Sequence, residues 1–242
     1  MADSHGVMLE DLPEEYGVHN FSNNGDSYFD METKLDYLIK NSPIDTLYIS
    51  IDTHALTSYR KQFNNLDRSV IYTDITHYNN SVSYLWNRYI HAYLVILQPK
   101  LGKILMNALK KSAKNRFADS NNTATKWHER SEKLRNESIN KRIALQYPST
   151  KIENELEGAF KRILQKCTEN NISVYGIQFP TVTQYREAIP LKSKVLETIL
   201  KSQKGTLLKV HNEAFTPLDF RDQDHLNKKG ATKFNQFLFQ KK

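Results

Sequence analysis

The stretch DTLYISI, residues 45–51, is a short apolar run with β-branched and aromatic side chains, which is typical of a buried strand. The segment before it, residues 30–40, carries apolar residues at helical spacing and ends at the helix-breaking sequence NSP. Residues 17–21 are expected to form another short strand, because they lead into the turn-rich sequence SNNGD. A strand, a helix and a second strand in this order predict a parallel β-sheet.

The same alternation returns in the C-terminal part of the chain. Amphipathic spacing predicts helices there, and two apolar runs predict further strands. The predicted elements are a helix over 152–168, a strand over 172–179, a helix over 192–202, a strand over 206–211 and a final helix over 227–240. The chain is therefore predicted to be an α/β protein.

Residues 64–148 interrupt this alternation. Apolar positions recur at helical spacing from 81 to 117, with a break at Pro99, and a further helix is expected around 126–145. We interpret residues 64–148 as a helical insertion that covers or caps an α/β core. The sequence then predicts a single domain over residues 1–242 that contains this insertion.

The composition is ordinary for a globular protein, with 39% hydrophobic and 25% charged residues in a chain of 242. The formal net charge is +7, but no recognised nucleic-acid-binding motif accompanies it, so no nucleic-acid partner is expected. The sequence has no apolar run of about eighteen residues and no basic-then-apolar signal segment. The single cysteine, Cys167, cannot form an intramolecular disulfide, and its apolar helical surroundings predict a core position.

Two short polar segments, one near each end of the chain, contain the residue types of a serine hydrolase. The first is DSHG at residues 3–6, and the second is DQDHLNKKGA at residues 222–231. Together they resemble the SGNH/GDSL hydrolase family, whose first block has the nucleophile in Asp-Ser and whose last block is Asp-x-x-His. The resemblance implies Ser4 as nucleophile, Asp222 as the acid and His225 as the base. It also implies a three-layer α/β/α sandwich with a flavodoxin-like parallel sheet.

The expected chemistry explains why these three residue types are needed. A serine hydroxyl is a poor nucleophile at neutral pH unless a base accepts its proton. Histidine titrates near neutrality and can accept and return that proton, while a carboxylate orients the ring. Asp222 lies three residues before His225, but Asp219 and Asp224 are also close enough in sequence to take this role. Asp224 is alternatively expected to cap the final helix.

The oxyanion hole matches the family only in part. The family places donors in a second block, around a glycine after a short strand, and in a third block of the form Gly-x-Asn. Gly25 fits the second block, so its backbone N–H and that of Ser4 are the expected donors. Asp52 stands where the third block has Asn, and an ionised carboxylate cannot donate a hydrogen bond. Either His54 or a backbone amide is expected to replace it, or the oxyanion hole is weaker.

The residues just before the nucleophile also depart from the family. Ala2 stands where Gly is usual, and only Met1 and Ala2 precede Asp3, although the family has a central strand there and a strand needs about five residues. This predicts a truncated product whose natural start lies upstream, where a membrane anchor could also lie. The sequence leaves the compartment and the oligomeric state open, with the cell envelope expected if an upstream segment is missing.

Three further side chains are expected to be ordinary structural residues. His5 and His54 are expected at the surface, since most polar residues of this kind lie there. Tyr185 follows a predicted strand and is a candidate for lining the site, with a packing role favoured.

The predicted function is a serine esterase that acts on an ester such as an acylated carbohydrate, without a cofactor or a metal ion. An O-acyltransferase on a cell-envelope glycan shares the acyl-enzyme chemistry and is the first alternative. The substitution at Asp52 favours a second alternative, a catalytically inactive SGNH-like domain that binds a glycan or another partner. A metal-dependent phosphoesterase is the third, because Asp3, His5, Asp26 and Asp30 are ligand types for metal ions.

Overall fold

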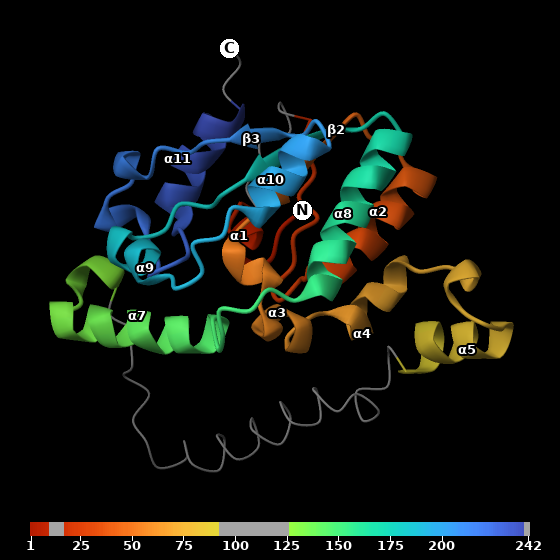
Figure 1. Cartoon of the computed structure of the whole chain (residues 1–242), viewed down its shortest axis with the longest axis horizontal. Helices are drawn as coiled ribbons and strands as arrows, with labels where there is room; N and C mark the ends of the chain where they lie inside the picture. The colour runs from red at the N-terminus through yellow and green to blue at the C-terminus, as the bar shows by residue number, and fades with distance from the viewer. Residues whose placement is uncertain (10–16, 92–125, 240–242) are drawn as a thin grey trace, which may run out of the picture. The chain divides into compact units, whose positions relative to one another are not determined.

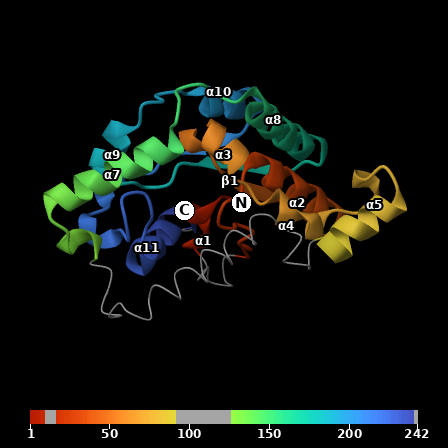
Figure 2. The same ribbon diagram turned by 90° about the horizontal axis from the view of Figure 1, so that it is seen from below.

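The computed structural model describes residues 1–9, 17–91 and 126–239. The chain divides into two compact units, which are Met1–Asn65 together with Lys126–Lys242, and Leu66–Thr125. The first unit contains all the candidate site residues and the β-sheet, whose strands are labelled in Figures 1 and 2. Within the described ranges, no helix is both long enough and apolar enough to cross a membrane.

Three parallel strands form the sheet, in the order β1, β2, β3. They are β1 (Thr46–Ser50), β2 (Ser173–Ile177) and β3 (Thr206–Leu208). Parallel strands joined through helices make this an α/β protein, as the sequence predicts. The strand predicted over residues 17–21 is wrong. The Asn20 side chain bonds to Gly6 O and to Ser22 N, so side-chain hydrogen bonds and not a strand ladder fix this segment.

Side chains of the strands alternate between two hydrophobic clusters on opposite faces of the sheet. Leu47 and Ile49 of β1 belong to the first cluster, and Tyr48 between them packs against the second. In β3, Leu207 packs against the first cluster and Leu208 against the second. Both faces of the sheet are therefore covered by apolar side chains, as is usual for parallel sheets.

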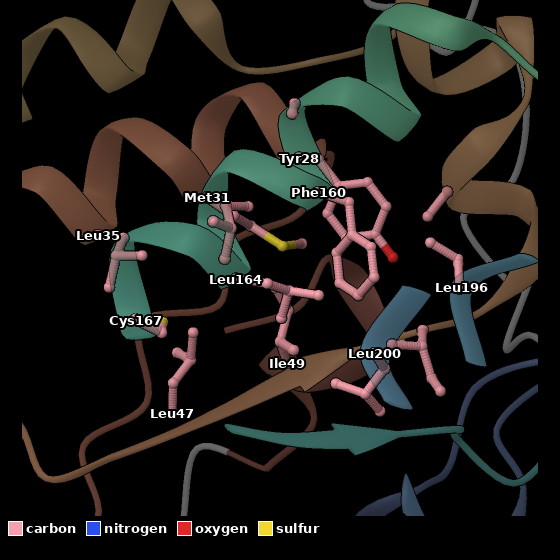
Figure 3. Packing of buried hydrophobic residues seen from close by; sticks show 14 of the residues in the cluster. Tyr28, Met31, Leu35, Leu47, Ile49, Phe160, Leu164, Cys167, Leu196 and Leu200 are labelled. Atoms are coloured by element: carbon pink, nitrogen blue, oxygen red, sulfur yellow. The ribbon is translucent and has the colours of Figure 1, made fainter. Parts of the chain in front are cut away.

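The first cluster packs against α2 (Tyr28–Asn41), α8 (Asn154–Glu169) and α10 (Val195–Ser202). Tyr28 and Phe160 pack together in it, with ring centroids 4.8 Å apart (Figure 3). Cys167 is fully buried in the same cluster, which confirms the core position predicted for it.

The second cluster packs against α7 (Glu132–Gln146) and α11 (Lys228–Phe239). Phe234 of α11 is fully buried, with its ring centroid 5.3 Å from that of Phe179, which follows β2. Ala2 and Leu9 flank α1 (Ser4–Val7) and belong to this cluster too. Figure 2 accordingly shows α1 and α11 on one side of the sheet, with α8 and α10 on the other.

Shorter helices complete the described parts of the chain. The first unit has α3 (Ser58–Gln62), α9 (Thr183–Ala188) and 3-10 turns at Thr53–Leu56, Trp127–Glu129, Asn212–Ala214 and Pro217–Asp219. The second unit has α4 (Leu66–Ser69), α5 (Ser81–Leu85), 3-10 turns at Val70–Tyr72 and Ile75–His77, and a π-helical segment at Trp86–His91.

The second unit is shorter than the helical insertion that the sequence predicts over residues 64–148. Residues 126–148, including α7, group with the first unit. The part of the predicted 81–117 helix beyond residue 91 lies outside the described residues. That this region caps the α/β core stays a prediction.

The first residues of the chain run alongside β1. The amino group of Met1 donates to Tyr48 O, and Ser50 N donates to Met1 O at 3.1 Å. The chain therefore reaches Asp3 and Ser4 just past the carboxyl end of β1. In open α/β sheets, ligands bind at this end of the strands.

Candidate active site

Ser4 lies at the first position of α1, in a turn fixed from both sides. Asp3 caps the turn, because its carboxylate accepts from His5 N at 3.0 Å. On the other side, a Cβ added to Gly6 would lie 2.2 Å from Ser22 Oγ, so this position needs glycine. The DSHG sequence is therefore a tightly packed turn that leaves Ser4 partly exposed.

The loop of residues 219–227, called the closing loop here, precedes α11 and is also fixed by hydrogen bonds and close packing. Asn227 N donates to Asp219 O at 3.0 Å, and Phe220 and Leu226 form an antiparallel bridge. Asn227 Oδ1 accepts from Gly230 N at 3.0 Å, so Asn227 caps α11 and the capping role considered for Asp224 is wrong. A Cβ on Gly230 would lie 2.1 Å from Asp219 O, which shows how closely the helix approaches the loop.

The structure brings Ser4, His225 and Asp222 together in a hydrogen-bonded chain. Nε2 of His225 lies 2.9 Å from Ser4 Oγ, and Nδ1 lies 2.8 Å from Asp222 Oδ1. Asp222 Oδ1 also accepts from His225 N at 2.9 Å. Burial opposes ionisation of Asp222, but the hydrogen bond and charge of His225 lower the pKa of the carboxyl below its usual value. The imidazole thus lies between the hydroxyl and the carboxylate.

The two competing aspartates have different surroundings. Asp219 accepts from Thr216 N at 2.9 Å and lies near the Lys229 and Lys233 side chains of α11. Asp224 Oδ1 lies 3.3 Å from His225 Nδ1, so a second carboxylate does face the ring. The fully buried Asp224 side chain is bound by Arg142 Nε at 2.7 Å.

Amide groups complete the surroundings of Asp224. Gln146 Nε2 donates to Asp224 Oδ2 at 3.2 Å, and Gln223 Nε2 donates to Oδ1 at 3.1 Å. Burial alone would raise the pKa of Asp224, but the contacts with His225 and His5 hold it well below the usual range. Asp224 is therefore an ionised carboxylate beside His225.

A buried polar layer lies behind this chain of three residues. The His5 ring stacks on the His225 ring, and its Nδ1 lies 2.7 Å from Asp3 Oδ1. Asp3 Oδ2 is also bound by Arg60 and by His54 Nε2, the latter at 2.8 Å. The surface positions expected for His5 and His54 are wrong, since they are 5% and 4% exposed. Both histidines are buried because the charges of Asp3 and Arg60 are buried with them and pair inside the protein.

The buried charges fix the protonation of this layer. Burial alone would raise the pKa of Asp3, but the charges of His5, Arg60 and His54 hold it well below its usual range. Burial opposes a charge on His5, yet Asp3 and Asp224 raise the pKa of its imidazole well above the ordinary value. Burial lowers the pKa of His54 to about 4. At neutral pH, His5 is therefore charged and His54 is neutral.

Asp52 and His54, which stand at the third-block position of the family, each bind another buried group. Asp52 Oδ1 accepts from Phe179 N at 3.3 Å, while its Oδ2 is buried without a hydrogen-bond partner within the described residues. Burial raises the pKa of Asp52 to about 7. His54 Nε2 binds Asp3 Oδ2 at 2.8 Å, and a donor role of His54 in an oxyanion hole stays a prediction. Gly25 has a φ of 90°, and the nearest atoms to a Cβ there belong to Asn65.

The backbone N–H of Ser4 stays a predicted donor. As the first helical residue of α1, it belongs to a group of amides that find no partner inside their own helix.

The metal-binding alternative does not fit the donor set. Two groups, Asp3 with His5 and His54, and His5 with Asp224 and His225, have ligand-type atoms within 4.8 Å of one another. Arg60 already binds the carboxylate of the first group, and Arg142 binds that of the second. A divalent cation would have to share these carboxylates with guanidinium groups.

The other acidic residues of the phosphoesterase pattern have separate roles. Asp26 pairs with Lys34, and Asp30 accepts from Ser27 in a capping box at the start of α2. They bind neither Asp3 nor His5 among the described hydrogen bonds.

Arg60, Arg142 and Gln146 were not identified from the sequence. They belong to α3 and α7, outside the two motifs, and reach the site only through tertiary packing. Asp224 could be identified from the motif, because the sequence has a second aspartate directly before the histidine.

Comparison with known proteins adds no family assignment: no family model and no curated protein matches the sequence.

Proposed function

We propose that this protein is a serine hydrolase of the SGNH type that cleaves an ester through an acyl-enzyme. The observation that carries the proposal is the chain from Ser4 Oγ through His225 to Asp222, with hydrogen-bond distances of 2.9 and 2.8 Å. Nucleophile, base and orienting acid at these distances are the signature of nucleophilic catalysis.

The proposed reaction proceeds in two halves. His225 Nε2 accepts the proton of Ser4 Oγ as the oxygen attacks the ester carbonyl, and the imidazolium then gives this proton to the leaving alcohol as the C–O bond breaks. Water attacks the resulting acyl-serine, again deprotonated by His225, and the carboxylic acid leaves as Ser4 regains its proton. Asp222 keeps the ring oriented and stabilises the imidazolium throughout.

The fold supports the same proposal. Ser4 follows the segment that runs along β1, while His225 precedes α11, so both lie at the end of the sheet where α/β proteins bind ligands. The two hydrophobic clusters on opposite faces of the sheet fit the three-layer sandwich of the family. Because every contact that carries the proposal lies in the first unit, the proposal does not depend on residues 66–125.

The nature of the second half-reaction separates hydrolase from transferase. A sugar hydroxyl in the place of water would make the protein an O-acyltransferase, with the same role for Ser4. Product analysis by mass spectrometry, with an acetyl ester and a sugar acceptor present together, distinguishes free acetate from acetylated sugar.

A fluorophosphonate probe tests the proposed nucleophile directly. We expect the wild type to be labelled at Ser4 and the Ser4→Ala variant to lose both labelling and hydrolysis of a chromogenic acetyl ester, by roughly a thousandfold or more. Ser202→Ala is the matched control, because Ser202 is exposed and its hydroxyl donates to a helix carbonyl, Ile199 O.

Equal hydrolysis by wild type and Ser4→Ala would remove Ser4 from the mechanism. A folded wild type that is not labelled at all would support the alternative of a binding domain, which the carboxylate at Asp52 already favours.

A further inference from the structure

A pocket of about 210 Å³ opens beside the proposed catalytic residues. Its lining includes Asp52 and Thr53, which follow β1, Phe179, which follows β2, and Asn212, which follows β3. The segments that follow the carboxyl ends of all three strands thus contribute residues to the pocket. Ligand sites of α/β sheets lie in this position.

The pocket is next to the Ser4–His225–Asp222 chain but separate from it. His5 lines one wall of the pocket, and the same ring stacks on His225 with the centroids 4.7 Å apart. None of Ser4, Asp222 and His225 lines the pocket. A ligand in it would therefore lie one imidazole ring away from the residues that perform the proposed reaction.

The charges that line the pocket are predominantly positive. Arg186 forms no ion pair within the described part of the chain, and Lys192 Nζ donates to the carbonyls of Arg186 and Glu187. Asp52 is the acidic residue of the lining, and burial raises its pKa to about 7, so it is only partly ionised at neutral pH. His5 is charged, but Asp3 and Asp224 compensate it from behind.

The uncharged part of the lining suits a hydroxylated ring. Tyr147 and Tyr185 present amphipathic rings, and Tyr147 Oη lies 2.9 Å from Thr53 Oγ1, where both hydroxyls can exchange hydrogen bonds with a ligand. Gln178 and Asn212 add amide donors and acceptors. The volume corresponds to about seven water molecules, which leaves room for one sugar-sized ring.

We propose that this pocket binds a saccharide ring that carries an anionic substituent, with Arg186 and Lys192 binding the anion. The link between this ligand and the ester substrate rests on the proposed function. Binding itself does not, because no residue of the proposed triad takes part. A carboxylate and a phosphate offer the same chemistry to a guanidinium group, so the experiment has one arm for each.

Binding of three simple probes to the full chain tests the proposal. Calorimetry with glucuronate, glucose 6-phosphate and glucose is expected to give binding for at least one anionic sugar and at least roughly tenfold weaker binding for neutral glucose. Binding of the anionic probe is expected to weaken as the salt concentration rises. The anionic sugar that binds more tightly identifies carboxylate or phosphate as the anionic substituent of the natural ligand.

Two arginine variants distinguish anion binding in the pocket from a general effect of the positive charge of the protein. Arg186→Gln is expected to weaken binding of the anionic probe roughly tenfold and to leave glucose unchanged. Arg162→Gln removes the same charge from α8, where Arg162 pairs with Glu32, and is expected to bind like the wild type. Circular dichroism checks that both variants are folded.

Several outcomes overturn the proposal. They are equal binding of glucose and the anionic sugars, equal losses in the two arginine variants, and no binding of either anionic sugar by folded wild type. Fluorophosphonate labelling distinguishes the two proposals: labelling of Ser4 without anion binding removes the pocket proposal alone. Anion binding without labelling removes the hydrolase and leaves the pocket in place.

Discussion

The imidazole of His5 lies flat against that of His225, with ring centroids 4.7 Å apart and ring planes 15° from parallel. One ring comes from the turn that carries Ser4, and the other comes from the loop before the last helix. Asp224 faces both rings, at 3.3 Å from His225 Nδ1 and 3.6 Å from His5 Nε2. The stacked rings therefore hold the turn that carries Ser4 against the loop that carries His225, and the two segments form one site.

Asp222→Asn tests which aspartate orients the catalytic ring. The asparagine keeps the shape but cannot stabilise the imidazolium, so kcat for ester hydrolysis is expected to fall by about 10²- to 10⁴-fold without a matching loss of stability. Asp45→Asn, at an exposed aspartate just before β1, is the control and is expected to retain wild-type kcat. Wild-type kcat in Asp222→Asn would transfer the role to Asp224.

Asp3→Asn tests the buried polar layer. The change leaves the buried guanidinium of Arg60 without its carboxylate and weakens the bonds to His5 and His54, so we expect the free energy of unfolding to drop by about 3–5 kcal/mol. Glu32→Gln breaks surface ion pairs with Arg162 and Lys166 and is expected to cost about 1 kcal/mol or less. Urea unfolding measures both, and similar losses would contradict the role of Asp3.

Gly230→Ala tests the close approach of α11 to the closing loop. The added methyl would lie 2.1 Å from Asp219 O, so we expect a loss of roughly 1–3 kcal/mol in stability and slower labelling of Ser4. Gly158→Ala in α8 meets only Arg162 Nη1 at 3.5 Å and is expected to stabilise the protein by up to about 1 kcal/mol. Thermal unfolding measures the stability of both glycine variants. Unchanged stability in Gly230→Ala would mean that the closing loop can move away from α11.

Asp52 makes a pH-dependent contribution to stability. Burial raises its pKa from 3.8 to about 7, so between these values the folded protein retains a proton that the unfolded chain has released. The contribution of this carboxyl to the free energy of unfolding therefore falls as the pH rises through this window. Relative to Asp52→Asn, the wild type is expected to lose roughly 2–4 kcal/mol between about pH 4 and pH 7 and to change little above that.

Urea unfolding of both proteins at several pH values checks this prediction. Taking the difference between wild type and Asp52→Asn cancels the titration of the other buried groups. A constant difference across the window would show that Asp52 ionises as it does in the unfolded chain.

Local sequence patterns predicted the strands that are buried on both faces. The apolar runs around Ile49 and Ile177 became β1 and β2 within one or two residues of the predicted ends. Residues 17–21 resemble a strand only in composition, and the side-chain hydrogen bonds of Asn20 hold them in an irregular conformation. Such bonds depend on which backbone groups lie nearby, and the sequence does not show that.

The site could be predicted only where its residues lie within the two motifs. The resemblance of the two motifs to SGNH/GDSL blocks predicted Ser4, Asp222 and His225, and the structure places these side chains in one hydrogen-bonded chain. His5 and His54 were assigned to the surface because polar residues usually lie there, whereas pairing with Asp3 allows both to be buried. Arg60 and Arg142 come from separate helices, and no pattern in the sequence links them to the motifs.

The hydroxyl of Ser4 and the imidazole of His225 lie 221 positions apart in the chain. Under the proposed function, a nascent polypeptide that does not yet include the closing loop lacks His225, the base that would activate Ser4. Onset of covalent labelling would then report that translation has passed this loop and that its long-range contacts have formed.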